Sequence, residues 1–344
     1  MEIFFPAQTL PLFQVFAPCF TAPSFAYFQS YVWALMVVEG RKCLTRLARC
    51  AFFHQRDLSS WERFLAVHRW SLTALTKCLV TLVVTKLGDQ LQVHGAYLLG
   101  TDTTLVAKTA KRMLGVQTWK DHSDNADRGG YLVGHHWNLV GLLSPWGTRW
   151  LCWPLVMRLV PGLQGARQWL VGAAVTPMSF WDAAIAAILE VTRCLGDASV
   201  RVVVLEGAKE PYILVSTDLT LSALQIIEIY GARFSIELTI RDLKQHFGLG
   251  DSQCTTTLAI LRFVHLACLA FCLWRLALLE HLDAGWLQVT SARVSLPEAP
   301  LSFQRVRRAL RAWATRQIIF ANSAPGADLE KIERDHEPLL HMLI

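Results

Sequence analysis

The stretch YGARFSIELTIRDLK, residues 230–244, sets polar side chains at helical spacing in a chain that is otherwise strongly apolar. At about 100° per residue, seven residues fall about 20° short of two full turns, so Tyr230, Glu237 and Lys244 lie along one line of a helix. Arg233, four residues before Glu237, lies about 40° from that line. Arg241 follows Glu237 by four residues, in the favourable acid-before-base order. The spacing therefore places one carboxylate among three cations and a phenol.

Two interpretations of this pattern are open. A run of opposite charges at this spacing is typical of a solvated, salt-bridged helix face. Alternatively, the carboxylate of Glu237 holds a metal ion while the neighbouring cations hold phosphate groups. The helix alone does not distinguish the two, so the rest of the chain has to be considered.

The composition requires a membrane location to be weighed. Hydrophobic residues make up 53% of the 344 residues, and the mean hydropathy is +0.33. The apolar run 258–279 is long enough to span a bilayer, but it contains Arg262, His265 and Arg275, which are costly in lipid. The run 3–38 is broken by four prolines and follows Glu2, which is unlike an export signal. We therefore expect a buried core helix at 258–279, no membrane partner and a cytoplasmic location.

Cysteine usage and charge exclude some classes and favour others. Nine cysteines are scattered without any Cys-x-x-Cys pair, which argues against a disulfide framework and against a zinc ribbon. The formal charge of +6 and the pI near 8.9 are modestly basic. This balance is compatible with a nucleic-acid partner.

The hydrophobic periodicity divides the chain into three regions. Residues 1–92 are predicted to be helical and are a candidate DNA-binding region, residues 93–254 form an α/β core, and residues 255–344 form a helical region with a polar tail. The expected helices are 42–53, a helix capped by Ser59 or Ser60, 72–87, 179–195 and 222–246. The expected strands are 96–102, 131–144, 148–160, 199–207 and 212–218. Strands followed by alternating helices and strands indicate a mixed sheet covered by helices.

Asp102 is the second acid of interest. It directly follows the apolar run YLLGT, so we expect it at the end of a buried strand. An aspartate in that position is most often a turn former or a helix cap. Combined with Glu237 on a covering helix, however, it would supply the oxygen ligands that two Mg²⁺ ions need for phosphodiester chemistry.

The spacing Tyr230-x2-Arg233-x3-Glu237-x6-Lys244 resembles the signature of bacterial insertion-sequence transposases of the DDE class. The segments GTDTT, GHHWNLVGLL, STDLTLSA and RDLKQHFGLGDSQ are also similar to that family, and the likeness covers roughly residues 20 to 280.

The resemblance implies an RNase H-like fold and Mg²⁺- or Mn²⁺-dependent DNA strand cleavage and transfer at transposon ends. It implies that Asp102 and Glu237 are the first and last metal-binding acids. Arg233 and Lys244 would contact phosphates of double-stranded DNA, Tyr230 would position the DNA, and Arg241 would add a further basic contact. We also expect a homodimer and association with the bacterial nucleoid.

The sequence departs from the family pattern at the second aspartate. The segment SVRVVV runs directly into LEGAKEP, as though a block were missing near 203–206. Glu206 is the nearest substitute, although it also fits a turn, and Asp182 and Asp197 are more distant ones. Four hypotheses follow: a transposase with impaired cleavage, a catalytically dead DNA-binding remnant, a nuclease that uses Glu206, and a membrane protein built on 258–279.

Two further clusters are candidates for binding. His122, His135 and His136 lie near Asp121 and Asp124, but adjacent strand residues point to opposite faces, so structural roles are expected. An arginine-rich stretch could bind the phosphate backbone or form an ordinary solvated helix face; it comprises Arg305, Arg307, Arg308 and Arg311.

Overall fold

The computed structural model describes most of the region between residues 10 and 281. The described residues are 10–49, 57–93, 96–109, 113–121, 130–146, 149–160, 201–205, 212–216 and 218–281, together with 303, 307, 310 and 311. The predicted helix 179–195 lies outside these residues, as do Glu206, Asp182, Asp197, His122 and Asp124.

The N-terminal region is helical, as predicted. Its elements are α1 (Leu10–Gln14), η2 (Ala17–Cys19), α2 (Ala22–Val37), α3 (Leu44–Ala48), α4 (Leu58–Ala66), α5 (Leu72–Leu87) and η3 (Gly88–Leu91). The predicted bounds of α5 are confirmed: the Ser71 hydroxyl accepts a hydrogen bond from the Ala74 amide, and Gly88 ends the helix with φ 50°. The predicted cap of α4 is wrong, because the helix begins at Leu58 with Asp57 as its N-cap residue.

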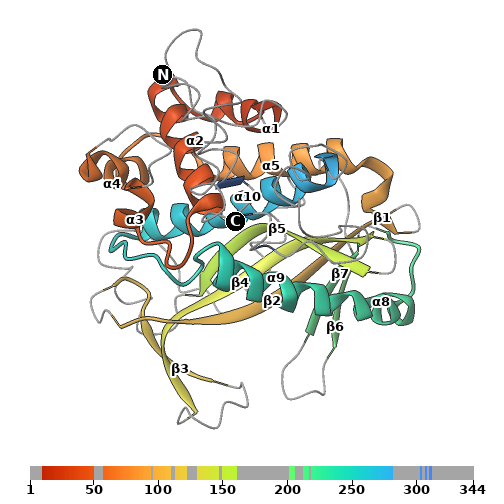
Figure 1. The fold of residues 1–344 in the computed structure, drawn as a ribbon. Coiled ribbons are helices and arrows are strands. Elements are labelled where there is room, and N and C mark those ends of the chain that lie inside the picture. The colour runs from red at the N-terminus through yellow and green to blue at the C-terminus, as the bar shows by residue number, and fades with distance from the viewer. Residues whose placement is uncertain are drawn as a thin grey trace, which may run out of the picture.

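Within the described residues, seven strands form one sheet, and Figure 1 shows their arrangement. They are β1 (Gln92–Val93), β2 (Ala96–Ala107), β3 (Gln117–Lys120), β4 (Tyr131–Trp146), β5 (Arg149–Val160), β6 (Arg201–Leu205) and β7 (Tyr212–Ser216). The order is β3-β4-β2-β7-β6, with β1 beside β2 and β5 beside β4. The predicted hairpin is confirmed as β4 and β5, which are joined through residues 147–148.

The α/β class is confirmed, but the described sheet is not mixed. Every pairing among the described strands is antiparallel. Short connections explain the hairpins, since two strands joined by a few residues can pair only in opposite directions, whereas parallel strands need a long crossover. β7 meets β2 at only two positions, where Leu98 and Leu99 pair with Ser216 and Val215.

The helix predicted at 222–246 is interrupted. It consists of α8 (Ala223–Ile229), the 3₁₀ turn η4 (Tyr230–Arg233) and α9 (Phe234–His246). Gly231, which has low helix propensity, lies in the 3₁₀ turn. α9 ends where predicted: Gly248 has φ 75°, and the Leu249 amide donates to the Leu243 carbonyl.

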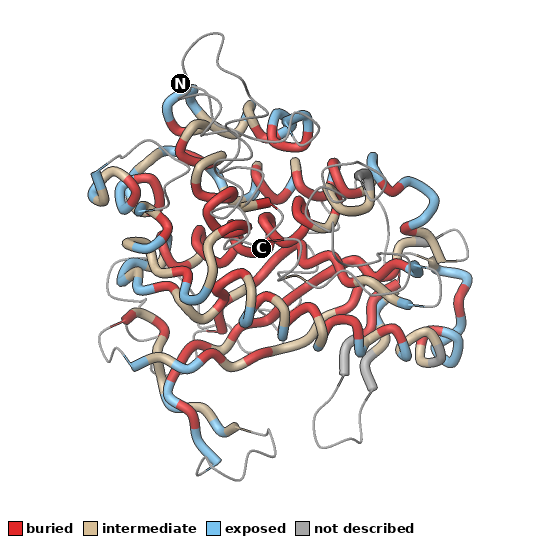
Figure 2. The backbone as a smooth tube through the Cα atoms, viewed as in Figure 1, coloured by how far each residue is buried: buried red, intermediate tan, exposed pale blue. Residues whose placement is uncertain are grey.

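The apolar segment near residue 258 is a core helix. α10 (Thr257–His281) contacts β5, α2, α4 and α5, and it crosses the region of densest burial in Figure 2. Its span Thr257–Leu279 is long and apolar enough to cross a membrane, but 83% of the most apolar window is buried inside the protein. The cations that make a lipid location costly are bonded internally: Arg262 donates to the Leu65 and Trp70 carbonyls, and Arg275 to the Cys152 carbonyl.

Candidate active site

Asp102 lies within β2 rather than at its end. The predicted strand end is wrong, because β2 continues for five residues to Ala107 and pairs with β4 over Leu98–Ala107. The segment after Asp102, which begins with two β-branched threonines and contains Val106, is favourable for a strand. Asp102 pairs with Leu139 of β4 in the middle of the ladder, so the paired strand fixes the backbone position from which its carboxylate extends.

Two groups hold the Asp102 carboxylate. The Thr103 amide donates to Oδ1 at 2.8 Å, and Arg233 Nη2 donates to Oδ2 at 3.0 Å. The side chain is only 18% exposed. Burial raises the pKa of the Asp102 carboxyl, although the Arg233 charge and the Thr103 amide both act in the opposite direction.

Arg233 connects Asp102 to the second acid. Its Nη1 donates to Glu237 Oε1 at 2.9 Å, one helical turn further on, while its Nη2 contacts Asp102. Burial by itself would lower the pKa of Arg233, but the attraction of Asp102, Tyr230 and Glu237 together raises it. An acid from β2 and an acid from α9, 135 positions apart in the sequence, therefore converge on one guanidinium.

The remaining residues of the predicted signature surround this cluster. Lys244 Nζ donates to the Leu105 carbonyl at 2.9 Å, which ties α9 to β2. The Tyr230 ring lies 5.5 Å from the centre of the Arg233 guanidinium. Arg241 is 57% exposed and pairs with Asp242 at 3.6 Å rather than with Glu237.

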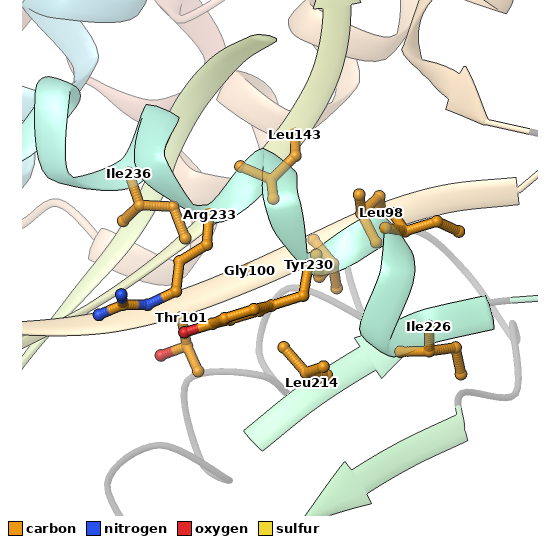
Figure 3. Close-up of a pocket in the computed structure, with 11 residues that line it drawn as sticks. Leu98, Gly100, Thr101, Leu143, Leu214, Ile226, Tyr230, Arg233 and Ile236 are labelled. Atoms are coloured by element: carbon orange, nitrogen blue, oxygen red, sulfur yellow. The ribbon is translucent and has the colours of Figure 1, made fainter. Parts of the chain in front are cut away.

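A small cavity adjoins the cluster, as Figure 3 shows, with the Tyr230 hydroxyl pointing towards Thr101. Its volume is about 20 Å³, which has room for about one water molecule. Gly100 of β2 allows Ile236 of α9 to approach the strand closely, because a Cβ atom at residue 100 would lie 2.6 Å from Ile236 Cδ1. The space is too small for a nucleotide, and its walls position α8 and α9 against β2.

The described residues do not fit a magnesium ion as their side chains lie. Mg²⁺ needs oxygen ligands, and the two carboxylates that supply them already hold a cation, Arg233. Among the described residues there is also no group of three or more His, Cys, Asp or Glu side chains that could hold a metal.

The two adjacent histidines have structural contacts, as expected. The buried His135 contacts the Leu114 carbonyl through Nε2 at 2.8 Å, and burial lowers its pKa to about 4. His136 is only partly buried and packs edge-on against Trp119, with ring centres 4.7 Å apart.

Arg307 has a role that the sequence pattern did not indicate. It is 5% exposed, and it donates to the Met36 carbonyl at 3.0 Å and to the His246 carbonyl at 2.7 Å. These carbonyls lie in the last turns of α2 and α9, where backbone acceptors lack helical partners. No local signal marks such a residue, since a buried arginine and a phosphate-binding one look alike in sequence. Arg311 pairs with Glu39 at 3.2 Å, while Arg305 and Arg308 lie outside the described residues.

The fold and this cluster define an α/β protein in which a central strand and a covering helix each present one acid to the same point. The sequence model of the DDE superfamily endonuclease family matches residues 15–166, somewhat less than half of the chain. The match includes Asp102 and β2–β5, and it stops before Glu237. It supports a transposase-like nuclease of the DDE type, a family that typically uses divalent metals and acts on DNA. A comparison with curated proteins gave no match.

Proposed function

We propose that this chain is a transposase-type DNA nuclease of the DDE class, with an RNase H-like core, whose strand cleavage is impaired. The observation that carries the proposal is the convergence of Asp102 and Glu237 on Arg233, in a chain whose first half matches the endonuclease family. Its substrate would be double-stranded DNA at transposon ends and at the target. The active form would be a homodimer associated with the nucleoid in the cytoplasm, and the metal that the family requires would be Mg²⁺ or Mn²⁺.

The impairment follows from the charges at the cluster. Asp102 and Glu237 carry two negative charges and Arg233 carries one positive charge, so their sum is only −1. Clamping both the attacking and the leaving oxygen of a phosphodiester takes two metal ions, and two ions need more carboxylate oxygens than this arrangement leaves free. Glu206 remains the candidate for a third acid.

DNA binding is supported by the outer surface of α9. Glu237, Arg241 and Lys244 are exposed along the same side of this helix, and Arg233 is close by. The Arg241 side chain is 57% exposed, and its contact with Asp242 is long at 3.6 Å, so its guanidinium is accessible to DNA. Lysine and arginine side chains release counterions from DNA, which gives binding a steep dependence on salt.

The test is DNA affinity measured by fluorescence anisotropy across a salt series, with a cleavage assay on the same duplex. Arg241→Gln is expected to weaken binding and to reduce the slope of log K against log salt by about one. Arg149→Gln, which removes an exposed arginine at the start of β5, is the matched control and is expected to leave the slope unchanged. Absence of salt-dependent binding by the folded wild type would contradict a role on DNA.

Cleavage separates the impaired enzyme from its alternatives. With Mg²⁺ or Mn²⁺, nicking by the wild type is expected to be very slow. Rapid nicking that is lost in Asp102→Ala would show that the site is competent. Rapid nicking that is lost in both Asp102→Ala and Glu206→Gln would show that Glu206 serves as the third acid. Binding without any nicking would identify the dead DNA-binding remnant.

A further inference from the structure

We propose that Arg233 acts as an internal cation that keeps divalent metal away from Asp102 and Glu237 until a phosphate group draws it aside. Metal and DNA would then load together. The inference rests on the proposed function for the identity of the phosphate, but its first half concerns only the three side chains.

The geometry places the guanidinium where a metal would have to bind. Arg233 uses two different nitrogens, Nη1 for Glu237 and Nη2 for Asp102, at 2.9 and 3.0 Å. The oxygens in these contacts belong to the only two acids that the structure brings together at this point among its described residues. A divalent ion that used both carboxylates would have to displace the guanidinium, because the two cations would repel each other at contact distance.

The same side chain is suited to leave for a phosphate. Arginine presents a planar fork that binds phosphate oxygens as it binds carboxylate oxygens, through paired N–H donors. Arg233 is 27% exposed and Glu237 is 45% exposed, so the cluster is open to a ligand on one side. Lys244 and Arg241 on the same helix raise the local potential for anions. A phosphodiester at this surface would compete for Arg233 and free both carboxylates.

The effects of DNA on metal binding and of metal on DNA binding must be equal, because both ligands are linked through the position of Arg233. If a DNA phosphate raises the affinity for metal by moving Arg233, then metal must raise the affinity for DNA by the same factor, typically about 5- to 150-fold. In this scheme metal alone binds poorly, so the carboxylates do not load metal in the absence of DNA.

The first test is calorimetric titration of Mn²⁺ into the full chain without DNA. Arg233→Met is expected to bind Mn²⁺ at least about tenfold more tightly than the wild type. Arg149→Met, which removes an exposed arginine at the start of β5, is expected to stay within about twofold. Adding Asp102→Asn to Arg233→Met is expected to abolish the gain. Equal Mn²⁺ affinity in the folded wild type and the folded Arg233→Met variant would overturn the proposal.

A second measurement does not depend on whether the variant folds. The Mn²⁺ affinity of the wild type is measured with and without a saturating short DNA duplex, and it is expected to rise about tenfold or more with DNA. An unchanged Mn²⁺ affinity on the DNA-bound protein would refute the coupling. Failure of the wild type to bind any duplex would count against the proposed function, and the Arg233→Met titration would then decide the role of Arg233 by itself.

Discussion

The ion pair between Arg233 and Asp102 offers a quantitative test of how the site is held together. The perturbations are Arg233→Met, which keeps most of the side-chain volume and removes the charge, Asp102→Asn, which keeps the acceptor for the Thr103 amide, and the double variant. Because the two residues are in direct contact, their effects on the free energy of unfolding are expected to be non-additive.

The magnitude can be worked from the contact. Two unit charges 3.0 Å apart attract by about 5 kcal/mol at an effective dielectric constant of about 20. Burial of Asp102 offsets much of this, as its raised pKa shows, and charge-assisted hydrogen bonds measured by mutation contribute about 1.5–3 kcal/mol. We therefore expect Arg233→Met to lose about 2 kcal/mol and the coupling energy to be about 1–2 kcal/mol. Arg241→Met, which removes a side chain that is 57% exposed and 3.6 Å from its partner Asp242, is expected to lose less than about 1 kcal/mol.

The stability lost in Arg233→Met should depend on pH in a definite direction. The pKa of Asp102 is raised in the folded protein, and removing Arg233 raises it further, so the folded state binds more protons than the unfolded state just above the usual pKa of aspartate. Stability therefore falls as pH rises through that window, and the deficit of Arg233→Met is expected to shrink from pH 7 towards about pH 4.

The assay is urea unfolding of the four proteins, followed by tryptophan fluorescence and far-UV circular dichroism, at pH 7 and at the lower pH. Additive effects at pH 7, with a coupling energy below about 0.3 kcal/mol, would refute the assignment of a stabilising Arg233–Asp102 pair. A deficit that is the same at both pH values would refute the claim that Asp102 carries the pH dependence.

Three other predictions concern the scaffold. Burial lowers the pKa of Lys42 to about 7, so above that pH the unfolded chain binds more protons than the folded protein, and stability should rise from about pH 7 to 10. In urea unfolding across this range, the stability of Lys42→Met should depend less on pH than that of the wild type, and at pH 7 the variant should be more stable by on the order of 3 kcal/mol. Gly134→Ala, whose Cβ would overlap the Val106 carbonyl oxygen, should lose at least about 2 kcal/mol in urea unfolding, whereas Gly231→Ala, with open space around it, should change stability by less than about 1 kcal/mol. Arg307→Met leaves two helix-end carbonyls without their donor and should lower the thermal midpoint, with a loss of about 2–3 kcal/mol.

The sequence pattern was sufficient to predict those elements whose structure is decided by residues close together in the chain. The helix Leu72–Leu87 follows from its Ser71 cap and its terminal glycine, and the β4–β5 hairpin follows from two apolar strands separated by the short sequence PWG. The expected convergence of Asp102 with Glu237 in space also appears in the structure, although their roles remain predictions.

Long-range contacts were beyond the reach of sequence pattern. Periodicity cannot show that Arg233 faces Asp102, because the partner lies on a distant strand and an arginine at this spacing fits a phosphate contact equally well. The end of β2 was misplaced because Asp102 was treated as a strand terminator, whereas pairing with β4 carries the strand past it. α10 illustrates the same limit, since a helix of 25 mostly apolar residues suits a bilayer or a core until the partners that cover it are known.

The position of α10 in the chain has a consequence for how this protein is made. α2 buries ten of its sixteen residues and packs against α10, which ends at residue 281. At roughly 5–20 residues per second, a ribosome needs on the order of 10–50 s to extend the chain from α2 to the end of α10. During that interval the part of α2 that later packs against α10 is accessible to chaperones and proteases. The yield of folded protein in a cell should therefore depend on chaperone supply more than the stability of the finished fold would suggest.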